Sequence, residues 1–325
     1  MLQTARNRGD SVDEAESFCR AALPQLKAWH DWLDGWRSNP SGLVEIHHGW
    51  ASGMDNSPRF DPAYDAIEVP VQFDLAQRCD LDLVDESERP SAEEYQRYIW
   101  LVRQLAQANF DDQAIRQTLD FRFGDVFSTA VLALASDDLA AMAVDLGQPE
   151  YVQAAQEMAA SCRASVAAAV DQTGLCRDYD VRAGRWLSSE TIAGFALMIC
   201  GGPADLVARQ REILLGERWM GHPSLKYPLP TSVSPASPNY RPRAYWRGPI
   251  WPIMNWYFAH TARLRGDIDL ASRLRDAGLA LLADDGKFSE YYQPATGEPL
   301  GSKNMSWTAM TAIDWLTAEQ WVGAK

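Results

Sequence analysis

Apolar residues recur at steps of three and four along the first strongly patterned stretch of the chain, residues 12–36. Leu26, Trp29, Leu33 and Trp36 fall on one face of a helix with 3.6 residues per turn. The spacing therefore predicts an amphipathic helix over 12–36. The same spacing favours core packing as the role of the tryptophans in this stretch, Trp29, Trp32 and Trp36.

A second helix is predicted from its start signal. Ser91 is followed three residues later by Glu94, which is the spacing of a capping box, and Tyr95, Ile99 and Val102 then share one face. Similar patterns predict helices over residues 112–121, 126–146, 150–170, 189–200, 204–217, 252–265, 268–283 and 303–318. Helices therefore account for most of the expected structure.

Strands are expected at one place only. Residues 174–187 alternate around an Ala-Gly turn, which predicts a short β-hairpin. No alternation of strands and helices appears, so a parallel sheet is disfavoured. The pattern predicts an all-α fold in which successive helices pair into the inner and outer layers of a toroid.

Two long stretches without helical pattern separate these elements. Residues 39–90 are rich in Gly, Pro and Asp, and residues 221–252 contain eight prolines. Long connections in compact domains usually line binding sites, and proline lowers the entropy lost when such a loop is ordered. We therefore expect the functional site in these loops.

Composition and charge exclude several classes of protein. The chain has 325 residues, 46% of them hydrophobic, and a formal net charge of −14, which disfavours binding to nucleic acid or to an anionic membrane. No apolar run approaches a membrane span, and the first residues lack the apolar core of a signal peptide, so a cytoplasmic location is expected. The cysteines and histidines show no metal-binding spacing, so no metal or other cofactor is predicted.

Three loop motifs combine aromatic rings with charged or amide groups. They are WASGMDNSPR at 50–59, YWRGPIW at 245–251, and EYYQPATG at 290–297 running on to SWTA. Trp50, Trp246, Trp251 and Trp307 lie in or beside these loops, which favours contact with a ligand over core packing. Rings that cover sugar C–H faces and paired carboxylates are typical of a carbohydrate site.

These motifs resemble, in the same order, signature blocks of the (α/α)6-barrel glycosidases of glycoside hydrolase family 63. They are most similar to its bacterial mannosylglycerate and glucosylglycerate hydrolases. The resemblance covers nearly the whole chain and implies one glycoside hydrolase domain over residues 1–325. It implies hydrolysis of a small α-glycoside, a small carbohydrate substrate, with inversion at the anomeric carbon.

The resemblance implies that Asp55 is the general acid and Glu290 the general base. Inverting hydrolysis requires one protonated and one ionised carboxyl group, separated by enough space for a water molecule. The alternative for Asp55 is a residue that shapes the turn before Asn-Ser-Pro, and for Glu290 a solvated turn residue.

The remaining site residues follow from the same blocks. Trp50 and Gly53 would wall the sugar subsite and Tyr245 and Trp246 would close over it, while the second and third motifs also contribute Arg247, Trp251 and Trp307. Arg89 and Tyr95 match the positions that grip the glycerate carboxylate in the family. A salt bridge from Arg89 to Asp85, Glu86 or Glu88 is the equal alternative.

One departure from the family concerns the number of helices. A complete toroid needs more helices than the patterns provide, and family members have a further stretch before the first motif, so we expect the early helices to be missing. The resulting gap would expose the apolar faces of the remaining helices unless a partner covers them. A homo-oligomer is therefore a possible arrangement. A neutral α-glucosidase or trehalase-like enzyme, and a sugar-binding remnant without activity, remain the alternative functions.

Overall fold

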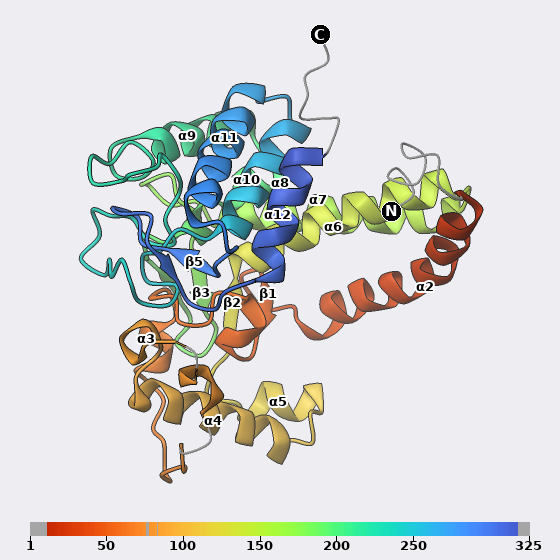
Figure 1. Cartoon of the computed structure of the whole chain (residues 1–325). Helices are drawn as coiled ribbons and strands as arrows, with labels where there is room; N and C mark the ends of the chain where they lie inside the picture. Colours follow the sequence, from red (N-terminus) through yellow and green to blue (C-terminus); the bar gives the residue numbers. More distant parts are fainter. Residues whose placement is uncertain (1–11, 76–77, 83, 318–325) are drawn as a thin grey trace.

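The computed structural model of the chain describes residues 12–75, 78–82 and 84–317. Helices dominate the structure (Figure 1). The longer helices are α2 (Val12–Trp36), α4 (Ala92–Gln107), α6 (Val126–Asp145), α7 (Val152–Ala168), α9 (Ala204–Leu215), α10 (Pro252–Leu264), α11 (Ile268–Asp285) and α12 (Ser306–Thr317). The shorter ones are α3 (Asp61–Tyr64), α5 (Asp112–Thr118), α8 (Ala196–Cys200) and the 3-10 turns η1 (Gly49–Ser52), η2 (Cys79–Leu81), η3 (Glu86–Glu88), η4 (Pro149–Tyr151) and η5 (Ile192–Phe195).

The predicted helices are present. Helix α2 occupies the expected range, and α4 begins with the expected capping box: the Ser91 hydroxyl accepts from the Glu94 N–H at 3.2 Å, and the Glu94 carboxylate accepts from the Ser91 N–H at 2.7 Å. The range 189–200 forms a 3-10 turn, η5, followed by α8. Both the helical fold class and the order of its helices are therefore confirmed.

Helix α6 forms the centre of the core. Its apolar residues are distributed around the helix, and it packs against α2, α7 and α8, with Ala130, Ala133 and Leu139 among its buried residues. By length and composition it is the one described helix that could cross a membrane, although no such run was expected from the sequence. Since 56% of its apolar window is buried inside the protein, its composition is that of a core helix.

Six short strands form two sheets. The first has the order β1 (Val44–Ile46), β2 (Phe123–Asp125), β3 (Asp178–Asp180) and β4 (Arg185–Leu187), all antiparallel, and the second pairs β5 (Tyr291–Tyr292) with β6 (Pro299–Leu300). The predicted hairpin is confirmed as β3 and β4. It is not the only strand pair, because β1 and β2 bring distant segments to its edge (Figure 1).

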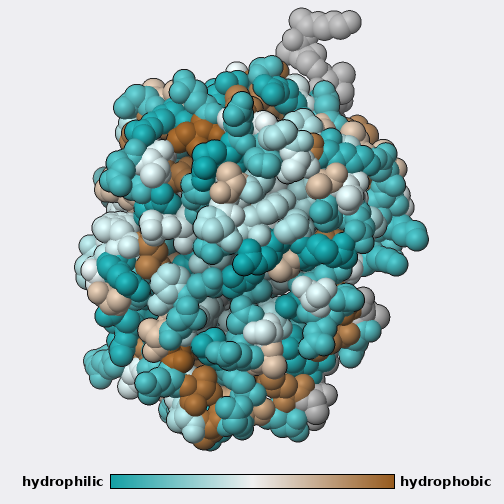
Figure 2. All heavy atoms as spheres, turned by 90° about the vertical axis from the view of Figure 1, so that its left-hand side faces the viewer, coloured by the Kyte–Doolittle hydropathy of each residue, from teal (hydrophilic) through white to brown (hydrophobic). Residues whose placement is uncertain are grey.

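Two tryptophans of α2 contradict their predicted core role. Trp29 is 56% exposed and Trp36 is 41% exposed, whereas Trp32 stacks on Trp29 and donates to the Asp112 carboxylate at 2.9 Å. The predicted face is wrong as the buried one, because the buried residues of α2 are Ala15, Cys19, Leu23 and His30, and Leu26 of the predicted face is also 42% exposed. By contrast, the face shown in Figure 2 is mostly hydrophilic, with hydrophobic residues in separate small patches.

Candidate active site

The first motif forms a tight loop that follows β1. Its 3-10 turn η1 is fixed at its N-terminal end, because His48 Nδ1 accepts from the Trp50 N–H at 3.0 Å and the Tyr64 hydroxyl accepts from the Gly49 N–H at 2.8 Å. Gly53 ends the turn with a φ of +69°, a conformation that glycine adopts at low cost. This geometry places Asp55, two residues later, in a half-buried position.

A buried ion-pair cluster anchors the end of the same loop. The Arg59 guanidinium is fully buried and donates to Asp125 at 2.7 Å and to Asp178 at 2.9 Å. Asp125 also caps α6 by accepting from the Ser128 N–H. Arg59 is the last residue of the first motif, and no sequence pattern indicated its partners, because they lie on β2 and β3, far away along the chain.

The Asp55 carboxyl has a perturbed protonation equilibrium. Its pKa is raised from 3.8 to about 6, and burial is the largest cause. The charge of Glu290 also raises the pKa, whereas a bond to its own backbone and the charge of Arg89 lower it. The influence of Glu290 shows that the two carboxyl groups lie close together, although they come from opposite ends of the chain. Asp55 is therefore protonated under mildly acidic conditions, as a proton donor must be.

Glu290 occupies a different environment, directly before β5. It is 6% exposed, and its Oε2 accepts from Arg89 at 3.0 Å and from the Ser302 N–H at 3.0 Å. The structure thus brings a protonatable Asp55 and a charge-stabilised Glu290 into one site.

Arg89 does not form the salt bridge that was proposed as its structural alternative. It pairs with Glu290, 201 residues away, and its guanidinium lies 4.4 Å from the centre of the Tyr245 ring. Asp85, one of the expected partners, instead accepts from Ser87. The local run of acidic residues suggested the wrong partner because loop closure brings a distant carboxylate nearer.

The second motif contributes a stack of aromatic rings. Trp246 and Trp251 are stacked with centroids 3.8 Å apart, Tyr291 stacks on Trp251 at 4.7 Å, and Tyr245 meets Trp251 edge-on at 5.3 Å. Tyr245 borders both carboxyl groups, since burial first and then the charges of Asp55 and Glu290 raise its pKa. Trp251 is only 1% exposed, so it supports the neighbouring rings and presents almost no surface of its own.

Trp50 and Tyr95 belong to a second group of aromatic rings, which contacts the first motif. The Trp50 ring is 41% exposed and packs on His48 at 4.3 Å, with Tyr95 at 6.3 Å. The Arg78 guanidinium lies 4.0 Å from the centre of the Tyr95 ring. The exposed face of Trp50 is therefore available to a ligand, while Tyr95 borders it from α4.

Arg247 is held by several acceptors. It donates to Asp61 at 2.6 and 2.9 Å, to Glu94 at 3.0 Å and to Asn56 at 3.3 Å. These bonds tie the second motif to α3, to α4 and to the loop that follows Asp55. The arrangement gives Arg247 the role of joining the motif loops.

An apolar groove begins next to Asp55 and runs between α2 and α12. Its volume is about 820 Å³, and Gly53, Met54 and Trp246 form its end near the site. The groove is lined further by Leu26, Trp29, Val131, Met254, Trp307 and Met310. Trp307, predicted to contact ligand, lies in this groove and is 42% exposed.

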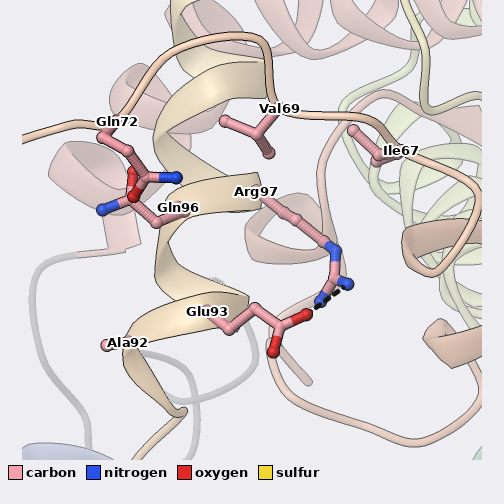
Figure 3. Close-up of a pocket in the computed structure, with 7 residues that line it drawn as sticks. All are labelled: Ile67, Val69, Gln72, Ala92, Glu93, Gln96 and Arg97. Atoms are coloured by element: carbon pink, nitrogen blue, oxygen red, sulfur yellow. Dashed lines mark hydrogen bonds and ion pairs between the residues drawn. The ribbon is translucent and has the colours of Figure 1, made fainter.

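Another cavity, of about 390 Å³, lies on the outer side of α4. Ile67, Val69 and Gln72 line one wall of it, and the ion pair between Glu93 and Arg97 spans the other (Figure 3). None of the predicted site residues lines this cavity. Among the residues that the structure describes, no group of three His, Cys, Asp or Glu side chains could hold a metal ion.

Residues 1–308 match the model of a family described as the mannosylglycerate hydrolase MGH1-like glycoside hydrolase domain. A glucosylglycerate hydrolase of Mycolicibacterium hassiacum is 44% identical over 322 residues, which are 97% of this chain and 72% of that protein. A mannosylglycerate hydrolase of Thermus thermophilus is 37% identical over 313 residues, which are 93% of this chain and 72% of that protein.

A solved structure agrees with these sequence relatives. The crystal structure of a family 63 mannosylglycerate hydrolase from Thermus thermophilus, in complex with Tris and D-glycerate, matches with a TM-score of 0.86 and 35% identity. The match covers 94% of this chain and 73% of that chain. The predicted (α/α)6 fold of these enzymes is thereby confirmed.

Proposed function

The chain belongs to the mannosylglycerate hydrolase MGH1-like glycoside hydrolase family and is a glycoside hydrolase, and from this premise we propose that it cleaves glucosylglycerate or mannosylglycerate to sugar and glycerate. The one observation that carries the proposal is the pairing of Asp55 and Glu290. One carboxyl has its pKa raised to about 6, and the other is charge-stabilised by Arg89.

The chemistry assigns one role to each carboxyl. Asp55, protonated, donates to the glycosidic oxygen as the bond breaks. Glu290 removes a proton from a water molecule that attacks the anomeric carbon from the opposite face, which inverts its configuration. In the described part of the chain the contacts of Glu290 go to Oε2, which leaves Oε1 for the water.

Substrate specificity in this proposal depends on Arg89. Its guanidinium lies between the Glu290 carboxylate and the Tyr245 ring, so a glycerate carboxylate that approached it would meet one of the few basic groups beside the site. A local cation is needed because the net charge of −14 opposes entry of an anion. Trp50, Gly53 and Tyr95 would border the sugar and glycerate, with Trp246 and Trp307 towards the groove.

A product-based experiment tests the reaction and its stereochemistry. The purified chain is incubated with glucosylglycerate, with mannosylglycerate and, as neutral comparisons, with trehalose and methyl α-glucoside. Early-time NMR of the released sugar then shows its anomeric form before mutarotation. We expect an inverted sugar from one of the two glycerate glycosides. Retention of configuration would refute the assigned mechanism, and faster cleavage of the neutral glycosides would favour the trehalase-like alternative.

The same measurement separates catalysis from binding alone. If calorimetry detects glycoside binding while no sugar is released, the chain is a sugar-binding remnant and the assignment of an active glycosidase fails. If sugar is released, Asp55→Asn provides the matched control, since it removes the proton donor and keeps the shape of the side chain.

A further inference from the structure

Glu88, the last residue of η3, is buried at the edge of the candidate active site. Its side chain is 7% exposed, and the sequence suggested it only as a partner of Arg89. In the structure its Oε2 accepts from the Gly301 N–H at 3.0 Å and from the Tyr291 hydroxyl at 3.4 Å, and its Oε1 accepts from Arg243 at 3.2 Å. One carboxylate thus collects donors from three separate segments.

Two of these donors are adjacent in the chain to the reacting carboxylate or to a group that contacts it. Gly301 precedes Ser302, whose N–H donates to Glu290 Oε2 at 3.0 Å, and Tyr291 follows Glu290 directly. The backbone of Glu88 also holds groups next to Glu290. Its carbonyl accepts from the Tyr245 N–H at 2.9 Å, and the residue that follows it is Arg89. Glu88 therefore fixes the surroundings of Glu290 from several sides.

The close approach of the Gly301 segment leaves no room for adjustment. Gly301 has a φ of +68°, and a Cβ placed on it would lie 2.6 Å from Glu290 Oε2 and 2.5 Å from the Tyr291 ring. A segment packed this tightly keeps its position only while its N–H groups have fixed acceptors. The Glu88 carboxylate supplies the acceptor for Gly301.

The bonds of Glu88 require a carboxylate. Both of its oxygens accept, from Gly301 and Tyr291 on one side and from Arg243 on the other. A glutamine at this position has one oxygen and one NH₂, so its NH₂ would face either the Gly301 N–H or the Arg243 guanidinium. Two donors facing each other in a buried position are costly, and the segment would shift.

We propose that Glu88 is a positioning residue for the general base. It holds the Gly301–Ser302 backbone and the Tyr245 backbone so that Ser302 and Arg89 bind Glu290 Oε2 and the other oxygen faces water. This inference rests on the proposed function of Glu290 as base. It predicts that the loss of Glu88 displaces both donors of Glu290 Oε2, which lowers turnover and changes its pH dependence without weakening substrate binding.

The test compares Glu88→Gln with Glu298→Gln. Glu298 is the matched control, because it also pairs with Arg243, at 2.6 Å, but lies on the surface. In Glu88→Gln we expect kcat to fall by about ten- to a hundredfold, KM to change little, and the acid limb of the pH profile to move to higher pH. In Glu298→Gln we expect kcat and the acid limb to match those of the wild type.

Three outcomes decide the proposal. An unchanged kcat per folded molecule and an unchanged acid limb in Glu88→Gln overturn it, and so does an equal effect in Glu298→Gln, which would assign the effect to Arg243. If Glu88→Gln does not fold, Glu88→Asp keeps the acceptors on a shorter side chain and should give a smaller shift of the acid limb in the same direction.

A second measurement tests the role of Glu88 independently of the proposed reaction. If the wild-type chain cleaves no glycoside, the proposed reaction is wrong, whereas the positioning role is still measurable in a crystal structure of Glu88→Gln. Displacement of Ser302 from Glu290 Oε2 supports the role, and an unchanged contact refutes it.

Discussion

The carboxylate cluster around Glu290 and the groove between α2 and α12 meet at Trp246 and Met54, yet they are built in opposite ways. In the cluster, Glu290 and Glu88 are nearly fully buried and each accepts from an arginine and a backbone N–H. In the groove, large apolar side chains such as Trp29 and Trp307 stay 56% and 42% exposed. The two carboxylates of the polar region have their donors, although the buried Arg89 Nε has no hydrogen-bond partner among the described residues, whereas the apolar side chains of the groove are left uncovered.

The difference follows from what burial costs each kind of group. An unpaired buried charge costs several kcal/mol, so a carboxylate is buried only together with its donors. An exposed apolar side chain forgoes roughly 1.5 to 3 kcal/mol of burial but leaves the fold intact. Buried carboxylates therefore need their hydrogen-bond donors within the folded chain. An apolar surface can stay exposed in the folded chain until a ligand or partner covers it.

The largest effect is expected from the paired carboxyls of the cluster. Asp55→Asn and Glu290→Gln should each lower kcat by about a hundredfold or more, because a general acid or base acts in the transition state. Circular dichroism should show the helix content of the wild type. A variant that keeps more than about a tenth of the activity with its glycerate glycoside would show that its carboxyl has another role.

Arg89→Ala should produce the next largest effect, because it removes one donor from the carboxylate cluster. Since Arg89 pairs with Glu290, kcat should fall on charged and neutral glycosides alike. In addition, KM should rise for glycerate glycosides alone, by a factor that corresponds to the loss of one charged hydrogen bond, about 1.5 to 3 kcal/mol. Arg218→Ala, which removes an exposed arginine that pairs with Glu190, is the control for general loss of charge. An equal rise in KM on both substrate classes would contradict contact with glycerate.

The third prediction concerns stability as a function of pH. The pKa of Asp55 in the folded protein, about 6, lies above its ordinary value of 3.8, so the folded state binds the proton more tightly. Its stabilising contribution is full below pH 3.8 and is lost as pH rises through about 6. Asp55→Asn does not titrate, so it should be more stable than the wild type at pH 8, by about 2 to 3 kcal/mol, and should lose this advantage near pH 4. Denaturant melts at the two pH values measure it, and a constant difference would contradict it.

The smallest effect is expected in the groove. The wild type should bind an apolar fluorescent dye there, and Met310→Lys should reduce the fluorescence while changing stability by less than about 0.5 kcal/mol. Val144→Lys is the matched control, because Val144 is a 63% exposed residue of α6 that does not line the groove. Equal dye binding by both variants would place the dye elsewhere.

Local signals predicted the helices well because they depend on near neighbours. The range 12–36 of α2 and the capping box of Ser91 and Glu94 follow from spacings of three and four residues, and the structure confirms both. The strands β1 and β2 were missed, although β3 and β4 are equally short, because no local turn joins β1 or β2 to its partner strand as the hairpin turn joins β3 to β4. Their pairing depends on segments that meet only in the folded chain.

In the candidate site, too, the sequence predicted local features and missed contacts between distant segments. The motifs singled out Asp55, Tyr245 and Glu290, and the structure brings the three together. No local pattern indicated that Arg89 pairs with Glu290, because that partner is set by loop closure. Nor could the pattern show that Trp29 is exposed, since a helical period defines an apolar face without saying what covers it.

The ion pair between Arg89 and Glu290 also has a kinetic meaning, because it closes a loop of 201 residues. Helices such as α6 and α7 form from contacts that are close in sequence, and such contacts are made early in folding. Long loops close later, because the chain must first lose the entropy of the intervening residues. During refolding, helical circular dichroism should therefore return before enzymatic turnover. The candidate active site then reports the last stage of folding, and recovery of the helices alone should not restore activity.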